Sequence, residues 1–266
     1  MRAWVSGRLV GSDECGGRAH TPDGFTFGDG VFEAVKVVHG RPFALTRHLR
    51  RLAASADALG LPPVDGDEVR RGVAAVLEGV DVPRARIRIT FTAGGDGRPT
   101  VTVAAPAASR RPTRPAAVLT VPWRRNERGP LTGHKATAYA DDILALRWAS
   151  ERGADEAVFA NTAGNLCEGT TSNVFYLHEG QLRTPSLESG CLPGISRALV
   201  LEWYGAREVD EPLDVLQRAE EIFLVSTTRD VQAVGSWDGR AFEAPGPVTR
   251  KVAAVWATKE AENPDP

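Results

Sequence analysis

Apolar and polar residues alternate along several short stretches of the chain, a period typical of half-buried strands. The clearest case is Ile87, Ile89 and Phe91, which are separated by polar side chains. Comparable strand patterns, several of them bounded by turn residues, occur at 3–5, 9–10, 32–38, 100–104, 116–123, 156–160, 173–177, 181–184, 222–226 and 231–237.

Other stretches have apolar residues at steps of three and four, which predicts helices. Leu49, Leu52 and Ala56 define one helix, which we expect Thr46 to cap and Gly60 to end. Further helices are predicted from Asp67, near 138–152, 195–204 and 213–219, and from Pro247.

The stretch 106–115 contains three prolines and three arginines and has little to bury. That composition favours a linker. We therefore expect an α+β chain with a small N-terminal domain (1–106), a linker (107–115) and a larger domain (116–266).

The composition of the 266 residues excludes several classes of protein. A net charge of −2 provides no general attraction to nucleic acid or to a membrane surface. Three scattered cysteines without CxxC spacing argue against a disulfide framework or a metal site. The polar N-terminus and the lack of a long apolar run predict a cytoplasmic protein.

Candidate chemistry lies in short motifs that are each weak alone. Lys135, in Gly-His-Lys-Ala-Thr, precedes a predicted helix, and partial desolvation would make its amine nucleophilic; taken alone, the residue is better explained as a surface lysine. Glu168 lies in a polar turn and could pair with a ring nitrogen of a cofactor, or simply face solvent. Leu-Pro-Gly-Ile-Ser-Arg at 192–197 begins a predicted helix whose free N–H groups suit a phosphate. An ordinary capped helix start explains the motif nearly as well.

The order and spacing of these motifs are more specific. With Phe-Gly-Asp-Gly-Val-Phe-Glu at 27–33 and His-Leu-Arg-Arg-Leu at 48–52, they resemble the class IV (fold type IV) pyridoxal phosphate aminotransferases. That family includes D-amino acid and branched-chain aminotransferases and aminodeoxychorismate lyase. The resemblance runs from about Trp4 to about Ala254. It implies a small α/β domain, a larger domain with a β-barrel-like core, pyridoxal 5'-phosphate as cofactor, and a homodimer.

The resemblance assigns the reacting end of the cofactor to three residues. Lys135 matches the lysine that forms the Schiff base and moves the substrate proton, and Glu168 matches the carboxylate that pairs with the pyridine nitrogen. Tyr139 falls where some members place a tyrosine near the cofactor hydroxyl, and Ala138 replaces an asparagine common in relatives.

The same resemblance assigns the phosphate to Arg51, to the N–H groups of Ile195 and Ser196, and to Thr228. A non-catalytic binding protein on the same fold is an alternative of another class. The presence of Lys135, Glu168 and Arg51 together argues against it.

Substrate residues are less defined. The strand from Phe32 to Lys36 is similar to that of D-amino acid aminotransferases, although Phe32 replaces their usual tyrosine. Lyases often have threonine where this chain has Ala34.

The candidate ligands for a substrate carboxylate are arginines. Arg86 and Arg88 share one strand face, and a solvent-exposed edge strand would explain them as well. Arg98 could replace a missing loop arginine, and Arg229 could shape the pocket. We expect a transaminase that acts on amino acids, D-amino acids first, or on primary amines, with a 2-keto acid acceptor. The alternative is 4-amino-4-deoxychorismate lyase, which makes p-aminobenzoate and pyruvate with the same lysine and glutamate.

Overall fold

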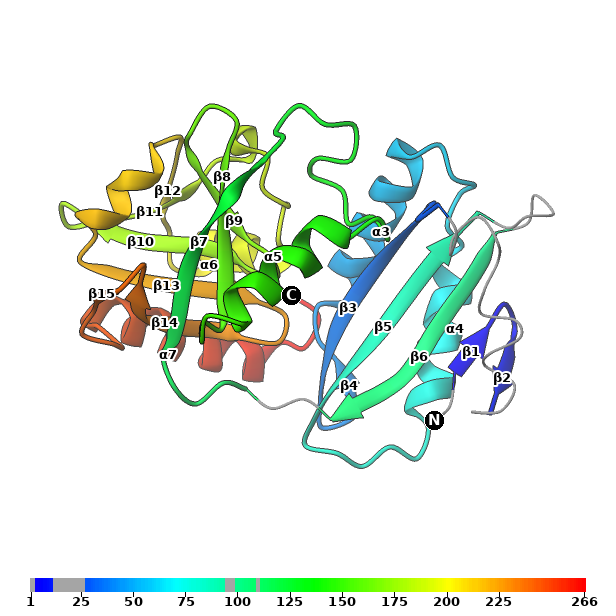
Figure 1. Cartoon of the computed structure of the whole chain (residues 1–266). Coiled ribbons are helices and arrows are strands. Elements are labelled where there is room, and N and C mark those ends of the chain that lie inside the picture. Colours follow the sequence, from blue (N-terminus) through cyan, green and yellow to red (C-terminus); the bar gives the residue numbers. More distant parts are fainter. Residues whose placement is uncertain (1–2, 12–26, 94–98, 109–110) are drawn as a thin grey trace. The chain divides into compact units, whose positions relative to one another are not determined.

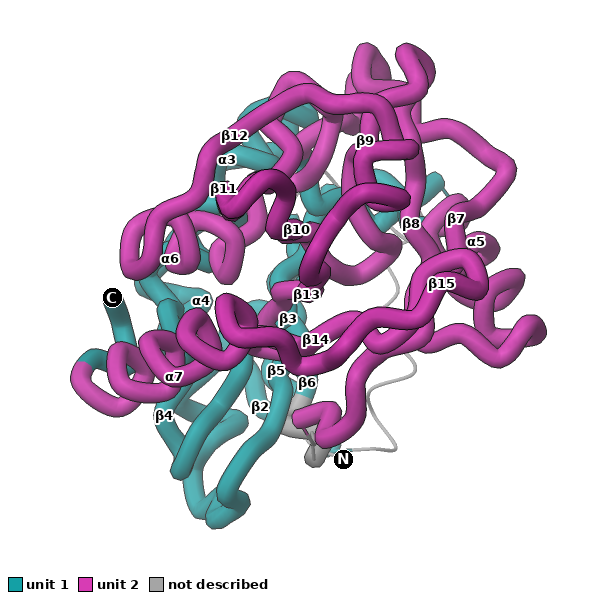
Figure 2. Tube along the Cα trace, turned by 90° about the vertical axis from the view of Figure 1, so that its left-hand side faces the viewer, with its two compact units in different colours: residues 1–110, 134–139, 263–266 teal, residues 111–133, 140–262 magenta. Residues whose placement is uncertain are grey.

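The computed structural model describes residues 3–11, 27–93, 99–108 and 111–266. The chain divides into two compact units, which are coloured separately in Figure 2. Unit 1 comprises residues 1–110, 134–139 and 263–266, and unit 2 comprises residues 111–133 and 140–262. Two short segments, 134–139 and 263–266, therefore group with the first unit, whereas the sequence analysis placed them in the larger domain.

Unit 1 contains, among its described residues, a six-stranded sheet in which every neighbouring pair is antiparallel. The strand order is β2-β1-β6-β5-β3-β4. Its members are β1 (Ala3–Val5), β2 (Arg8–Val10), β3 (Gly30–Val38), β4 (Arg41–Pro42), β5 (Arg84–Thr92) and β6 (Thr100–Ala108).

Strand β6 is longer than the sequence predicted and extends into the expected linker. Pro106 has no N–H to donate to a ladder, which is why the pattern favoured an end at Ala104. The register shifts at this point, because Arg88 faces Ala104 while Arg86 faces Ala107. The bulge accommodates the proline and lets pairing resume.

Two helices, α3 (Leu45–Ala58) and α4 (Gly66–Leu77), cover one face of this sheet, as Figure 1 shows. Their apolar stripes pack on alternate residues of β3, β5 and β6. The core so formed includes Leu45, Leu49, Leu52, Val69, Val73, Val76, Val31, Val35, Ile87, Ile89, Phe91 and Val103.

The expected Thr46 cap of α3 is wrong. The helix begins at Leu45, and its N-cap Ala44 makes no side-chain capping hydrogen bond. Asp265 supplies the acceptor instead, taking the Thr46 N–H at 2.9 Å and the Thr46 hydroxyl at 2.6 Å. A partner 219 residues away is invisible to a local capping rule.

Unit 2 is built on a curled sheet of nine described strands. Its path is β12-β11-β10-β13-β14-β7-β8-β9, with β15 paired to β14, and β9 at the end of the path lies beside β10. The strands are β7 (Ala116–Arg125), β8 (Glu156–Asn161), β9 (Leu166–Gly169), β10 (Asn173–His178), β11 (Gln181–Pro185), β12 (Arg207–Val209), β13 (Glu221–Ser226), β14 (Asp230–Trp237) and β15 (Arg240–Ala241).

The helices of unit 2 are α5 (Ala140–Ser150), α6 (Ile195–Trp203) and α7 (Pro247–Glu262), with short 3-10 turns η1 (Leu187–Ser189) and η2 (Leu213–Gln217). Two predictions differ from this. The expected helix at 213–219 is only the turn η2, and strand β9 occupies part of what was taken as a polar turn. Within the described ranges, no helix combines the length and the apolar character needed to cross a membrane.

Candidate active site

The sheet of unit 1 has two faces of opposite character, because side chains alternate along β3 and β5. Val31 and Val35 face the helices, so Phe32 and Lys36 belong to the other face. In the register, Lys36 is opposite Arg86, and Ala34 is opposite Arg88. The face of this sheet that points away from α3 and α4 therefore concentrates cationic side chains next to one aromatic ring.

Lys135 is attached to this sheet by its backbone. The Phe32 N–H donates to the Lys135 carbonyl at 2.9 Å, and the Thr137 N–H donates to the Gly30 carbonyl at 2.8 Å. Gly30 also allows β3 to approach β5 closely, because a Cβ there would lie 2.6 Å from Thr92 Cγ2 and 2.8 Å from the Phe91 carbonyl; it would lie 3.2 Å from Thr137 Oγ1. The two backbone hydrogen bonds thus hold the lysine segment against the start of β3.

Phe32 brings the predicted reactive residues of unit 1 together. Lys135 Nζ lies 4.5 Å from the centroid of its ring, and the Arg88 guanidinium carbon lies 3.7 Å from it. The Tyr139 ring meets Phe32 edge-on at 5.5 Å. Arg88 is exposed as a residue, and partial burial of its guanidinium lowers its pKa; the nearby Arg86 lowers it further, and Tyr139 opposes both effects. Within the described residues no carboxylate forms an ion pair with Arg88, so its exposed guanidinium can pair with an incoming carboxylate.

Arg51, the predicted phosphate ligand, lies in a buried ionic cluster on the helix side of the sheet. Its Nε and Nη2 donate to the two carboxylate oxygens of Glu33 at 2.8 and 2.7 Å. His48 Nδ1 lies 2.6 Å from Glu33 Oε2 and donates to it, because an ionised carboxylate only accepts. The glutamate of the 27–33 motif and the His and Arg of the 48–52 motif therefore form one structural unit, which the sequence did not reveal.

Electrostatics determine the protonation of this cluster. Burial acts to raise the pKa of Glu33, but attraction and hydrogen bonds from Arg51 and His48 outweigh it and lower that pKa to about 2. Burial lowers the pKa of His48 more strongly than Glu33 raises it. Near neutral pH the cluster is thus an ion pair of Glu33 and Arg51, with a neutral His48.

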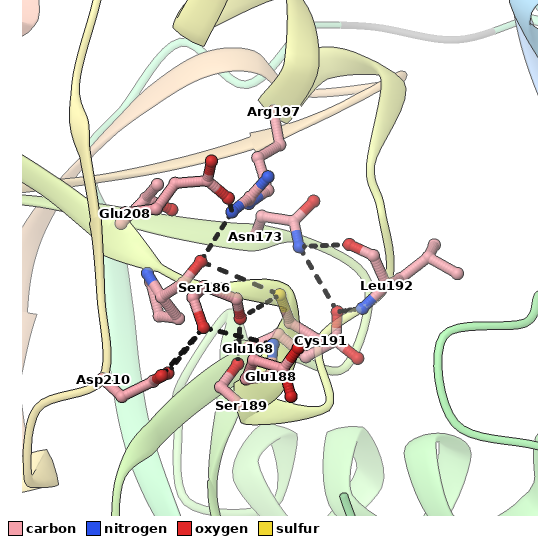
Figure 3. Close-up of polar contacts among 12 residues, drawn as sticks. Glu168, Asn173, Ser186, Glu188, Ser189, Cys191, Leu192, Arg197, Glu208 and Asp210 are labelled. Atoms are coloured by element: carbon pink, nitrogen blue, oxygen red, sulfur yellow. Dashed lines mark hydrogen bonds and ion pairs between the residues drawn. The ribbon is translucent and has the colours of Figure 1, made fainter.

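In unit 2, Glu168 lies on β9 opposite Phe159 of β8. Its Oε2 accepts from the Leu192 N–H at 3.0 Å and from Asn173 Nδ2 at 3.4 Å, as Figure 3 shows. Arg125 Nη2 lies 3.7 Å from Oε1. The carboxylate is 12% exposed, so it is held in place yet accessible to a ring nitrogen.

The start of α6 is shaped for an anion. Its N-cap Gly194 makes no side-chain capping hydrogen bond, and a Cβ there would lie 1.9 Å from Asn173 Oδ1. Ile195 and Ser196 occupy the first helical positions, where N–H groups lack helical partners. Thr228 lies in the turn between β13 and β14, and the buried Ser226 Oγ of β13 has no hydrogen-bond partner in the described part of the chain. Amide and hydroxyl donors of this kind fit a phosphate group.

The remaining predicted residues are placed as follows. Lys36 Nζ lies 4.4 Å from the centroid of the Phe43 ring. Arg98 is outside the described residues. Arg229 directs its guanidinium to Gln232 Oε1 at 2.5 Å, and to Glu156 Oε2 and the Asp155 carbonyl, each at 3.2 Å.

Two residues of this region had no predicted role. Asn173 donates to the Leu192 carbonyl at 3.0 Å as well as to Glu168, and so links the carboxylate to the turn before α6. Glu156 is fully buried at the start of β8. An acidic residue that opens an apolar strand, followed by three consecutive hydroxyl residues at 170–172, was the available signal.

Comparisons with known proteins identify the family of this chain. The family model of amino-transferase class IV matches residues 30–237. A candidate branched-chain-amino-acid aminotransferase of Methanocaldococcus jannaschii is 31% identical over 95% of this chain and 94% of its own length. D-alanine aminotransferase of Bacillus licheniformis is 29% identical over the same shares, 95% and 94%.

Two solved structures have the same fold. The fold IV transaminase CpuTA1 of Curtobacterium pusillum has a TM-score of 0.80 and 32% identity, covering 89% of each chain. A candidate 4-amino-4-deoxychorismate lyase of Legionella pneumophila has a TM-score of 0.83 and 25% identity, covering 89% of this chain and 93% of its own. Because the family model covers most of the chain and the fold matches, this chain belongs to the class IV aminotransferases, a family of fold type IV enzymes that depend on pyridoxal 5'-phosphate.

Proposed function

We propose that the protein is a transaminase that moves an amino group from an α-amino acid, D-amino acids first, to a 2-keto acid. The observation that carries the proposal is the position of Lys135 Nζ and the Arg88 guanidinium against the same Phe32 ring, at 4.5 and 3.7 Å from its centroid. The amine and carboxylate of an α-amino acid are separated by one carbon. A site for such a substrate therefore needs a cation close to the reacting amine.

The two residues have separate tasks in this proposal. The planar guanidinium of Arg88 binds the substrate carboxylate through two N–H donors and orients the α-carbon. Lys135 Nζ would hold the cofactor, and its amine would receive the proton from that α-carbon. The edge of Tyr139 against Phe32 fixes the ring on which both cations lie.

The proposed cofactor ligands are Arg51 and Tyr139 from unit 1, and Glu168, Ile195, Ser196 and Thr228 from unit 2. When bound, pyridoxal 5'-phosphate supplies an electron sink for the negative charge that forms at the substrate α-carbon. Glu168 keeps the ring nitrogen protonated and thereby strengthens the sink, since an ionised carboxylate stabilises a cationic partner. The N–H groups at the start of α6 and the Thr228 hydroxyl hold the phosphate.

D-amino acids are placed first for two reasons. The D-alanine aminotransferase relative covers nearly the whole chain. The strand from Phe32 to Lys36 also resembles that of D-amino acid aminotransferases, with Phe32 in place of their usual tyrosine.

Aminodeoxychorismate lyase is the second candidate, and the similar Legionella structure favours it. Such a lyase uses the same lysine and glutamate, so the ligands of the cofactor do not distinguish the two reactions. The fate of the substrate's amino group distinguishes the two reactions. A transaminase passes that group to a 2-keto acid, whereas the lyase releases it in p-aminobenzoate.

The test is the visible absorption of the purified, cofactor-loaded protein before and after D-alanine is added without a keto acid. Loss of the visible band with one equivalent of pyruvate released supports the transaminase. An unchanged band with D-alanine and with a panel of D- and L-amino acids contradicts it, and turnover of aminodeoxychorismate then establishes the lyase. A Lys135→Ala variant should show neither reaction.

Arg88→Met tests the carboxylate site, with Arg86→Met as a matched control on the same strand face. Loss of hydrogen bonds to a charged group should lower kcat/KM for D-alanine roughly 10- to 100-fold in the Arg88 variant. The effect should appear mainly in KM, and the Arg86 variant should stay close to the wild type. Equal losses in both variants would contradict a specific role for Arg88.

We also propose a homodimer, with the apolar surface of unit 2 as the contact. Trp123, Ile143 and Leu144 are 41, 46 and 50% exposed on β7 and on α5, which packs against it. Exposed apolar clusters of this kind mark interfaces in assemblies. Light scattering should give twice the chain mass for the wild type and the chain mass for Ile143→Glu; a monomeric wild type contradicts the proposal.

A further inference from the structure

Glu156 is a buried carboxylate with an unusual set of partners. It is fully buried, and its two oxygens accept from five donors on three segments of unit 2. One is the Ala157 N–H beside it in the chain, at 3.1 Å. Burying a carboxylate is costly unless it is paired and hydrogen-bonded, so this arrangement depends on the other segments remaining in place.

Three of the donors are consecutive hydroxyls. Thr170 donates to Oε1, while Thr171 and Ser172 donate to Oε2 at 2.7 and 3.0 Å. These residues follow Glu168 almost directly, and the turn is closed by the Thr170 N–H, which donates to the Ala157 carbonyl at 2.9 Å. Glu156 therefore fixes the turn that ends the strand of the proposed ring-nitrogen ligand.

The fifth donor comes from the turn between β13 and β14. Arg229 Nη2 donates to Glu156 Oε2 at 3.2 Å, so one oxygen accepts from both turns. The guanidinium is also held by Gln232 and by the Asp155 carbonyl, and it is 13% exposed. Its neighbour in the chain is Thr228, a proposed phosphate ligand.

We infer that Glu156 and Arg229 are positioning residues that lock the Thr228 turn to the turn after Glu168. The inference rests on the proposed cofactor site. The pair holds the ligand of the phosphate and the ligand of the ring nitrogen in one fixed relation, so that both engage a rigid cofactor at once. Arg229 accordingly acts through Thr228, and it does not bind the substrate carboxylate.

The proposed link between the two turns depends on Glu156 being an ionised carboxylate. A carboxylate offers only acceptors, and every group around it is a donor. A glutamine of the same shape would place an NH₂ group against hydroxyl hydrogens or the guanidinium. At least one turn would then lose its anchor.

The experiment compares two ligands of the protein, pyridoxal 5'-phosphate and pyridoxal, which lacks the phosphate. Dissociation constants are measured by absorption and fluorescence for the wild type, Glu156→Gln, Arg229→Met and a matched control. The control is Arg240→Met, because Arg240 is also an arginine of unit 2 that donates to backbone carbonyls, those of Leu216 and Ala219.

We expect Glu156→Gln and Arg229→Met to weaken pyridoxal phosphate binding about 10-fold or more, the loss of roughly one well-placed interaction. The dissociation constant for pyridoxal should change much less. The ratio of the pyridoxal constant to the pyridoxal phosphate constant should therefore fall toward unity. Arg240→Met should leave the ratio at its wild-type value. Since Arg229 is partly exposed in a turn, its variant carries the test alone if Glu156→Gln does not fold.

Three results would overturn the inference. An equal loss of affinity for both ligands would show that the two residues have a general structural role and do not position the Thr228 turn. A raised KM for D-alanine in Arg229→Met, with unchanged cofactor affinity, would show a substrate-binding arginine. A wild-type protein that binds no pyridoxal phosphate would overturn the proposed function along with the inference, whereas an unchanged ratio in a cofactor-loaded protein overturns the inference alone.

Discussion

Two glutamates of this protein, Glu33 in unit 1 and Glu156 in unit 2, are both fully buried, but their surroundings differ. Glu33 is held by the side chains of Arg51 and His48, two groups that can carry positive charge. Glu156 is held mainly by hydroxyls, with Arg229 as its only ion-pair partner among the described residues. A carboxylate among ionisable groups depends on their charge states. A carboxylate among hydroxyls depends on the shape of the loops that carry them.

Glu33→Gln should have the largest effect, because it removes the negative charge that accepts two hydrogen bonds from the largely buried Arg51 guanidinium. Removing one partner of a buried ion pair costs about 3–5 kcal/mol. Glu156→Gln should cost less, about 1–3 kcal/mol, because Arg229 makes only one hydrogen bond to Glu156 and keeps those to Gln232 and to the Asp155 carbonyl. Urea unfolding of both variants at pH 7.5 measures the difference, and equal losses would contradict the distinction between the two clusters.

The two clusters also show what the sequence could and could not reveal. Alternation along β5 and the three- and four-residue steps of α3 predicted both elements, because each pattern reflects a local repeat facing one core. The motifs at 27–33 and 48–52 identified the family. The contact between Glu33 and Arg51 was missed, because pairing across 18 residues depends on how α3 packs on β3.

Glu156 shows the same limit at longer range. Its first position in β8 was predicted, but its donors at 170–172 and 229 come from turns that meet only in the folded sheet. The sequence suggested Arg229 as a residue that shapes the pocket, because it follows Thr228. Closeness in the chain does not determine the direction of the Arg229 side chain, and the structure directs it to Glu156. Local patterns thus locate candidate residues, and tertiary contacts decide which of them face a ligand.

Acid should destabilise the Glu33 cluster in two steps. The lowered pKa of His48 means that the unfolded chain takes up a proton below about pH 6.5 while the folded chain resists it. The contribution of His48 is therefore complete above pH 6.5 and is lost as the pH falls. Glu33, with its pKa lowered from 4.5 to about 2, contributes fully above pH 4.5 and loses that contribution as the pH falls toward 2.

The first step can be isolated with His48→Asn, whose side-chain nitrogen can still donate to Glu33. Urea unfolding of the wild type at pH 7.5 and 5.5 should show a loss at the lower pH, and the variant should show a smaller loss. An identical pH dependence in the two proteins would mean that His48 does not carry the effect.

Thr171→Val should have the smallest effect, since it removes one donor among five around Glu156 and leaves the Ser172 hydroxyl on the same oxygen. We expect a loss of about 0.5–1.5 kcal/mol in the free energy of unfolding, and recovery in Thr171→Ser, which keeps the hydroxyl. Combining Thr171→Val with Ser172→Ala should cost more than the sum of the single changes, because Oε2 then retains only Arg229 as a donor among the described residues. A strictly additive pair would mean that each hydroxyl acts alone and that the turn is not held as a unit. The comparison with Glu33 would then reduce to a difference in the strength of single bonds.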